Sequence, residues 1–245
     1  MLKVSLILTT YNCLENLKGT LKSIASQDYP NLEIIIADGL STDGTLEYIQ
    51  TFSEESSFPV VWQSEKDYGI YDAMNKGYAL STGEIIAFFN DTFTKSNSIS
   101  LLIKEIETHP DCIGVHSDLV YMQNDIIKRY WRMGDGEIIK GWMPAHPTLF
   151  LKKEVYQKYG IFNTGYICSA DYEFMVRILG NTGNKLAYVP ETLISMYYGG
   201  TSTGGFKNYI VSLKEAHHAL VTNQIPHPFK IDFLRIIKFV QQFFI

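Results

Sequence analysis

The sequence predicts an α/β protein with a mainly parallel central sheet flanked by helices and a smaller antiparallel element in its second half. Short apolar runs rich in isoleucine and valine alternate with segments of helical spacing through residues 1–110. Such continuous apolar runs are typical of strands buried on both faces of a parallel sheet. After residue 110 the alternation stops, and two β-rich segments follow each other directly.

The composition fits one sizeable globular core. Of the 245 residues, 46% are hydrophobic and 19% are charged, which are ordinary values for a globular protein. The net charge of −5 and the pI near 5.7 argue against nucleic acid as a partner, because that binding needs a basic face. Three widely spaced cysteines indicate neither a disulfide framework nor a zinc site. Without a signal peptide or an apolar run of transmembrane length, we expect a cytoplasmic location.

The elements of the first half follow in order. Residues 4–8 form a short β-rich run, and leucines recur after it at helical spacing. A second strand is expected over residues 32–38, with a turn and then a helix for which Asp43 is the candidate N-cap. The third strand, VVWQ, precedes IYDAMNKGYAL, and the fourth, EIIAFFN, precedes the helix SISLLIKEIETH.

The second half predicts a different arrangement. IGVHSDLVYM and IIKRYWRM, joined by the turn QND, are expected to form an antiparallel hairpin. After a helix over DYEFMVRIL, two further strands are expected over KLAYVP and LISMYYGG. Since no linker rich in proline, serine or glycine separates the halves, we interpret the chain as one fused domain.

Polar loops follow the first four predicted strands: TTYN, ADGLSTDG, QSEKDYG and NDTF. In an open parallel sheet ligands bind beyond the carboxyl ends of the strands. Asp38 ends a strand of isoleucines, where packing gives no reason for a carboxylate. These loops therefore predict the position of the binding site.

Five motifs carry a resemblance to a known family: VSLILTTYN, LEIIIADGLSTDGT, GIYDAMNKG, GEIIAFFNDTF and SADYEFMVRIL. In this order and spacing they resemble the inverting family-two glycosyltransferases of GT-A (Rossmann-like) fold, especially bacterial enzymes that build exopolysaccharide, capsule or lipopolysaccharide. The resemblance ends near residue 200. It implies a nucleotide-diphosphate sugar donor, a divalent cation (Mg²⁺ or Mn²⁺) and direct displacement at the anomeric carbon by an acceptor hydroxyl.

The resemblance assigns the nucleobase pocket to the first two strand ends. Thr9 and Tyr11 would flank the base, and Asp38 would accept a hydrogen bond from the ring imide of uracil or thymine. A UDP- or dTDP-sugar is therefore the expected donor. An alternative interpretation of TTYN is a strand end followed by a helix cap at Asn12.

The resemblance also places three residues of GIYDAMNKG against the ribose and diphosphate, namely Asp72, Asn75 and Lys76. A lone lysine on a helix is equally typical of a solvated surface. His146, in GWMPAHPTLF, is expected to orient the donor or the acceptor, although a histidine beside prolines is often structural.

The metal-binding motif of the family reads Asn90-Asp91-Thr92 in this sequence. Mg²⁺ prefers oxygen ligands and keeps several waters, so one carboxylate with two phosphate oxygens can suffice. We expect Asp91 to bind the metal, Asn90 to contact the ribose and Thr92 to be a weaker ligand. Two alternatives stay open: catalysis with weak metal dependence, and Asp91 as a cap of the helix that begins near Ser96.

The acceptor hydroxyl needs a general base, and the resemblance assigns this role to Asp171. An acid at a helix start is also what the helix dipole favours, and Glu173 is the alternative base. The Gly-rich run 197–203 could close over the diphosphate or form a plain loop, since it lacks the spacing of a phosphate loop.

The resulting hypothesis has three segments. Residues 1–110 form the nucleotide-sugar-binding half, residues 111–205 the acceptor-binding half, and residues 206–245 C-terminal helices. The expected function is sugar transfer to a glycan or lipid-linked acceptor in cell-surface polysaccharide synthesis. The apolar and basic tail HPFKIDFLRIIKFVQQFFI fits the inner face of a membrane, or packing on the domain or on a second subunit as a homodimer.

Two other functions stay open on the sequence alone. A sugar-1-phosphate nucleotidyltransferase has a related sheet but normally begins with a basic Gly-rich loop, which LILTTYNCLEN lacks. A non-catalytic module that binds a sugar nucleotide or a glycan would account for the incomplete metal motif.

Overall fold

The computed structural model describes residues 1–124, 126–198 and 206–242. The strands are β1 (Val4–Thr10), β2 (Leu32–Asp38), β3 (Val60–Ser64), β4 (Ile85–Phe88), β5 (Thr92–Phe93), β6 (Gly114–Gln123), β7 (Ile126–Trp131), β8 (Phe150–Lys152) and β9 (Ala187–Tyr197). The helices are α1 (Leu14–Ala25), α2 (Thr45–Glu55), α3 (Ile70–Leu80), α4 (Ser98–Thr108), α5 (Lys153–Tyr159), α6 (Ala170–Leu179), α7 (Phe206–Thr222) and α8 (Pro228–Gln241), with short 3₁₀ turns η1 (Ile138–Lys140) and η2 (His146–Thr148).

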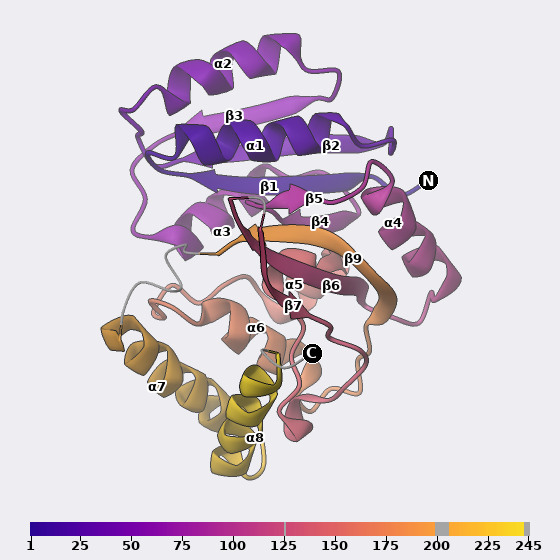
Figure 1. Cartoon of the computed structure of the whole chain (residues 1–245), viewed down its shortest axis with the longest axis vertical. Coiled ribbons are helices and arrows are strands. Elements are labelled where there is room, and N and C mark those ends of the chain that lie inside the picture. The colour runs from indigo at the N-terminus through magenta and orange to yellow at the C-terminus, as the bar shows by residue number, and fades with distance from the viewer. Residues whose placement is uncertain (125, 199–205, 243–245) are drawn as a thin grey trace.

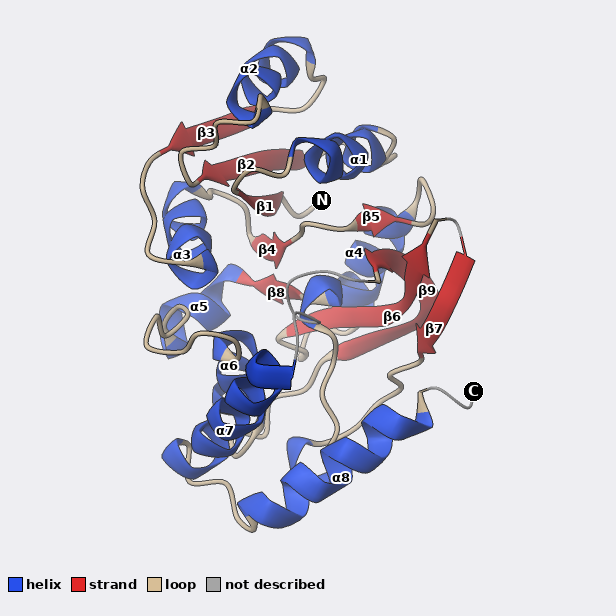
Figure 2. Ribbon diagram, turned by 60° about the vertical axis from the view of Figure 1, so that its left-hand side comes forward, coloured by secondary structure: helices blue, strands red, loops and turns tan. Residues whose placement is uncertain are grey.

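Within the described residues all the strands join one mixed sheet in the order β3-β2-β1-β4-β8-β6-β9-β5, with β7 paired to β6. Strands β3, β2, β1 and β4 are parallel to one another. β8 pairs antiparallel to both β4 and β6, and so joins the two halves. The sheet curls across the second half (Figure 2). The predicted α/β class with a mainly parallel sheet is confirmed.

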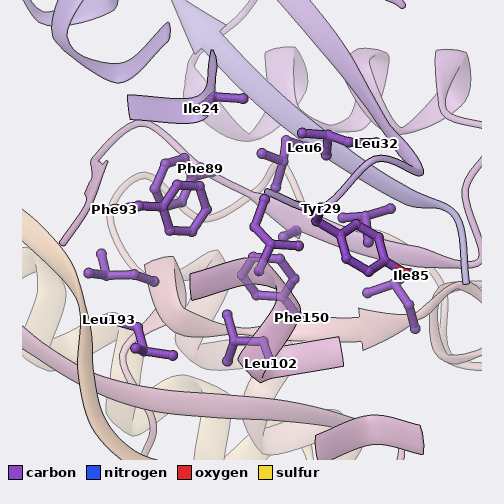
Figure 3. Close-up of a cluster of buried hydrophobic side chains, with 14 of the residues drawn as sticks. Leu6, Ile24, Tyr29, Leu32, Ile85, Phe89, Phe93, Leu102, Phe150 and Leu193 are labelled. Carbon is purple, nitrogen blue, oxygen red and sulfur yellow. The ribbon is translucent and has the colours of Figure 1, made fainter. Parts of the chain in front are cut away.

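Helices cover both faces of the sheet (Figure 1), and the strand residues alternate between two apolar cores. Leu6 and Leu8 face the core made with α1, α2 and α4, part of which is seen in Figure 3. Ile7 faces the other core, made with α3, α5 and α6. This two-sided burial explains why the strands have no polar face.

Close packing brings α3 onto the sheet. A Cβ atom at Gly77 would lie 2.4 Å from Cγ2 of Ile7, so only glycine permits this approach of helix to strand. The first turn of α3 is thereby held near the carboxyl ends of the strands, where the predicted site lies.

Two local predictions were wrong in detail. Most of the described residues of KLAYVP and LISMYYGG form a single strand, β9, because the pairing with β6 skips over Pro190 and Glu191 in a register shift rather than ending there. Proline lacks the N–H that the ladder needs, and a bulge accommodates it. At α2 the N-cap is Gly44, one residue later than expected. Asp43 instead accepts hydrogen bonds from Thr45 and from the backbone N–H of Leu14.

The C-terminal helices α7 and α8 lie at the end of the molecule opposite α2 (Figure 1). His217 Nδ1 and Asp232 Oδ2, 2.6 Å apart, link the two helices. None of the helices in the described part of the chain is both long and apolar enough to span a membrane. Most of the Gly-rich run 197–203 lies outside the described residues.

Candidate active site

A cleft of about 460 Å³ opens at the carboxyl ends of the parallel strands, between the end of β1, helix α1 and the start of α3. Its polar or aromatic lining residues are Thr9, Thr10, Tyr11, Asn16, Thr20, Asp67 and Asn90. Three of the predicted substrate-binding residues, Thr9, Tyr11 and Asn90, therefore lie together. Tyr11 leaves 66% of its surface exposed, so its ring is available to a ligand.

Thr9 and Asn90 bind each other across the ends of β1 and β4. The backbone N–H of Thr9 donates to Oδ1 of Asn90 at 3.0 Å, and Nδ2 of Asn90 donates to Oγ1 of Thr9 at 2.9 Å. These two hydrogen bonds hold Asn90, the first residue of the predicted metal motif, against the end of β1 at the cleft. Contact of Asn90 with a ribose stays a prediction.

Asp38 is buried at the end of β2 and organises the following turn. Its carboxylate accepts hydrogen bonds from the hydroxyls of Thr10, Ser41 and Ser64 and from the backbone N–H of Ser41. Burial alone would raise the pKa of Asp38, but these hydrogen bonds outweigh it and lower the pKa. The carboxylate is thus ionised and held beside the cleft, and its predicted contact with the base stays a prediction.

The three predicted residues of α3 have contacts within the protein. Lys76 Nζ lies 3.0 Å from Glu65 and 3.2 Å from Asp72. Asn75 binds both backbone groups of Phe162, donating to the carbonyl at 2.9 Å and accepting from the N–H at 3.0 Å. Asn75 thereby fastens a loop of the second half to the first, a role that the motif did not indicate. Ligand binding by these residues is untested.

Asp91 stands directly after Asn90 and is half-buried. Within the described residues its carboxylate has neither a hydrogen bond nor an ion pair, and burial raises the pKa of Asp91 to about 7. Burial raises the pKa of Tyr121 on β6, and the charge of Asp91 adds a smaller contribution in the same direction, so Asp91 lies near the second half. The part of the chain that the structure describes contains no group of three or more His, Cys, Asp or Glu side chains placed to hold a metal ion. Asp91 is the carboxylate of the predicted motif, and no residue in the described ranges pairs with it.

The alternative of Asp91 as a helix cap is wrong. Strand β5 separates Asp91 from α4, whose N-cap is Asn97. Thr92 Oγ1 donates to the carbonyl of Ser195 on β9, which ties the motif to the second half.

Asp171 lies in the first turn of α6. The hydroxyl of Tyr71, in the first turn of α3, donates to Oδ1 of Asp171 at 3.0 Å. Burial, and then the charge of Asp171, raise the pKa of Tyr71 well above its usual range, so this hydroxyl keeps its proton. The two residues are 100 positions apart, and nothing in the sequence indicated their contact.

His146 belongs to the same region. Its ring lies 5.9 Å from that of Phe88 and 5.5 Å from that of Phe162, centroid to centroid. Burial lowers the pKa of His146, although the charge of Asp171 acts against this shift. A neutral imidazole beside Asp171 fits the predicted orienting role, which stays a prediction.

Glu173, the alternative base, has partners within the protein. It is buried and binds Arg177 through two hydrogen bonds, of 3.1 and 2.6 Å, and Asn223 through a third. Its carboxylate is thus engaged by a side chain of α6 and by the residue that follows α7.

Comparisons with known proteins identify the family of this chain. The family described as Glycosyl transferase family 2 matches residues 5–174. A PGL/p-HBAD biosynthesis glycosyltransferase of Mycobacterium tuberculosis is 29% identical over 216 residues, covering 84% of this chain and 80% of the relative. An Escherichia coli UDP-Glc:alpha-D-GlcNAc-diphosphoundecaprenol beta-1,3-glucosyltransferase is 27% identical over 233 residues, covering 89% of this chain and 90% of the relative.

Solved structures resemble the fold over almost the whole chain. S. aureus TarS 1-349 in complex with UDP-GlcNAc has a TM-score of 0.74 at 16% identity, covering 98% of this chain and 73% of that one. The mannosyltransferase PcManGT of Pyrobaculum calidifontis, in complex with GDP-Man and Mn²⁺, has a TM-score of 0.72 at 20% identity, covering 97% and 70%. These likenesses show the GT-A fold. With most of the chain matched by the family, the protein belongs to glycosyl transferase family 2 and is a nucleotide-sugar-dependent glycosyltransferase.

Proposed function

We propose that this enzyme transfers a sugar, with inversion, from a UDP- or dTDP-sugar to a hydroxyl of a glycan or lipid-linked acceptor in cell-surface polysaccharide or glycolipid synthesis. The observation that carries the proposal is the half-buried carboxylate of Asp91, with which no described residue pairs, directly after Asn90 in the wall of the cleft. A diphosphate bound at this wall would lie near that carboxylate.

The donor proposal rests on the cleft and on the relatives. Thr9 and Tyr11 offer a hydroxyl and an exposed ring at its mouth, and an aromatic ring is a stacking surface for a nucleobase. One structural neighbour is in complex with UDP-GlcNAc, and the E. coli relative is named for UDP-Glc. The other neighbour holds GDP-Man, so the base must be determined by experiment.

The residues at the end of β4 fit a divalent cation. Burial disfavours the charged form of Asp91, and a bound Mg²⁺ or Mn²⁺ would reverse that preference by supplying the missing positive charge. When bound, the cation would neutralise charge on the pyrophosphate leaving group. Asp91 would hold it from the protein side.

Asp171 would take the proton of the acceptor hydroxyl as that oxygen attacks the anomeric carbon. The bond from the anomeric carbon to the diphosphate breaks as the new glycosidic bond forms, with inversion. Neutral His146 beside Asp171 can orient the acceptor by a hydrogen bond without competing for the proton.

The first test is a thermal-shift screen of UDP, dTDP and GDP, each with Mn²⁺ or with a chelator. We expect UDP or dTDP with Mn²⁺ to raise Tm most, because a ligand that binds only the folded state stabilises it by about 2.7 kcal/mol at one hundred times its Kd. Release of the sugar from the matching donor would then be measured. A non-catalytic module would bind the nucleotide without any turnover, and no nucleotide binding would contradict the proposal.

We also propose that α8 is the surface through which the enzyme meets an anionic membrane. Large apolar side chains on α8 are 38% to 78% exposed: Phe229, Phe233, Ile236, Ile237, Phe239 and Val240. The helix carries Lys230, Arg235 and Lys238 against one acid, Asp232, whereas the whole chain is negative. Such a helix suits a lipid interface, and two copies meeting face to face would oppose like charges.

Flotation with vesicles containing anionic lipid tests the membrane proposal. Phe229→Ser with Phe233→Ser should release the protein from the vesicles, since each replacement removes exposed apolar surface from the interface. Val61→Ser on the edge strand β3, which is 41% exposed, is the matched control and should bind like the wild type. Unchanged flotation of the α8 variant would contradict a membrane role. So would a wild-type dimer in sedimentation that the two replacements convert to a monomer, because α8 would then be a subunit interface.

A further inference from the structure

The hydroxyl of Tyr71 is buried at the meeting point of the two halves. Tyr71 is 8% exposed, and its hydroxyl lies against Oδ1 of Asp171 and the first backbone N–H groups of α6. A carboxylate can only accept, so the tyrosine must be the donor. Since Tyr71 stays protonated, the hydrogen bond is available across the working pH range.

The scaffold fixes both partners of this hydrogen bond. On the α3 side, the ring of Tyr71 packs 5.8 Å from that of Phe162, whose backbone is bound at both ends by Asn75. On the α6 side, the loop before Asp171 is held by Glu215, which accepts hydrogen bonds from the backbone N–H groups of residues 167 and 168, each at 2.8 Å. Because both sides are held in this way, we expect neither Tyr71 nor Asp171 to shift when their hydrogen bond is removed.

Few other polar groups act on Asp171. The titratable groups near it are Tyr71 from α3, His146 from η2 and Cys168 from the loop before α6, with Glu215 of α7 behind that loop. Burial lowers the pKa of His146 and raises the pKa of Cys168, so both are neutral. The hydroxyl of Tyr71 is thus the side-chain donor that the structure directs at this carboxylate.

We propose that Tyr71 is a positioning residue for the general base: its hydrogen bond orients Oδ1 of Asp171 and leaves Oδ2 to receive the acceptor proton. Among the described residues, no protein group is hydrogen-bonded to Oδ2. This inference rests on the proposed role of Asp171.

Tyr71→Phe tests the proposal, because it removes the hydroxyl and keeps the ring. We expect kcat to fall roughly 10-fold, with the donor KM within about twofold, since a hydrogen bond to a charged group is worth a factor of this order. A residue that only supported the fold would instead lower Tm and leave kcat unchanged. The matched control is Tyr78→Phe on the same helix, where the ring packs on Tyr156, and it should leave kcat and the donor KM unchanged.

A double-mutant cycle separates positioning from stability. In an Asp171→Asn background, Tyr71→Phe should cause no further loss of residual transfer, because the two residues act as one unit. A lower Tm with unchanged kcat would overturn the proposal. So would a full, additive loss in the Asp171→Asn background.

The carbon-13 chemical shift of the Asp171 carboxyl distinguishes this inference from the proposed function. Tyr71→Phe should change this chemical shift, and an unchanged chemical shift would overturn the inference. If the wild type transferred no sugar from any donor, the proposed function would fail, and the chemical shift would still decide whether the hydroxyl of Tyr71 binds the carboxylate.

Discussion

Asp171→Asn should lower sugar transfer by at least roughly 10²-fold, because an acceptor hydroxyl is a poor nucleophile and a positioned base typically contributes about 10²–10⁴-fold. Asparagine preserves the size of the side chain and can still accept the hydrogen bond of Tyr71, so the start of α6 should stay intact. Binding of the nucleotide donor should be unchanged, since the cleft is formed by β1, α1 and α3. Transfer rates and donor affinities of the purified variant provide the measurement.

The matched control for Asp171→Asn is Glu154→Gln, which removes an exposed carboxylate from the first turn of α5. It should transfer sugar at the wild-type rate. If Asp171→Asn retained transfer within about threefold of wild type, the base assignment would be wrong.

Asp91→Asn should abolish the effect of Mn²⁺ on Tm and weaken donor binding by roughly 10-fold or more, as loss of a metal ligand does. The same variant should be more stable than the wild type when no metal is present. Burial raises the pKa of Asp91 from 3.8 to about 7. Between these values the unfolded chain is ionised while the folded protein holds the proton, so stability falls as pH rises and levels off above pH 7.

The penalty from Asp91 should be on the order of 1–2 kcal/mol above pH 7, less than the full shift would give because the side chain is only half-buried. Mn²⁺ displaces the proton, so its affinity for the wild type should rise with pH up to about 7. Thermal unfolding between pH 5 and 8, with Mn²⁺ or EDTA, measures both effects. The control Asp111→Asn, in an exposed loop, should behave as wild type, and an undiminished Mn²⁺ response in Asp91→Asn would remove Asp91 from the metal site.

Much of the fold could be predicted because the first half obeys local rules. Apolar runs such as residues 32–38 are buried on both faces, and their period and length identify them without any tertiary information. The second half depends on pairings that local patterns do not encode. The division of β9 into two strands was wrong because Pro190 is a strand terminator by local rules, while pairing with β6 carries the strand past it.

The site divides in the same way. The family resemblance assigned Thr9, Tyr11 and Asn90 to the site, and the structure brings these residues together in one cleft. Contacts that join distant segments could not be predicted. Tyr71 meets Asp171 only because Gly77 lets α3 lie close against β1 and Asn75 then holds the loop at Phe162. The raised pKa of Asp91 likewise results from burial by the folded chain, which the sequence motif does not describe.

The three-residue strand β8 has a consequence for how the chain can be divided. It lies between β4 and β6, and its pairing with β4 is antiparallel. A chain made only as far as residue 110 would leave Ile85–Phe88, a fully apolar stretch, as an open edge, and such edges recruit other chains and lead to aggregation. During synthesis, β4 therefore has no β8 to pair with until residues 150–152 have left the ribosome. Residues 1–110 and 111–198 thus share one sheet through β8, so a replacement of residues 111–198 by those of a related enzyme would need a strand that pairs with β4 as β8 does.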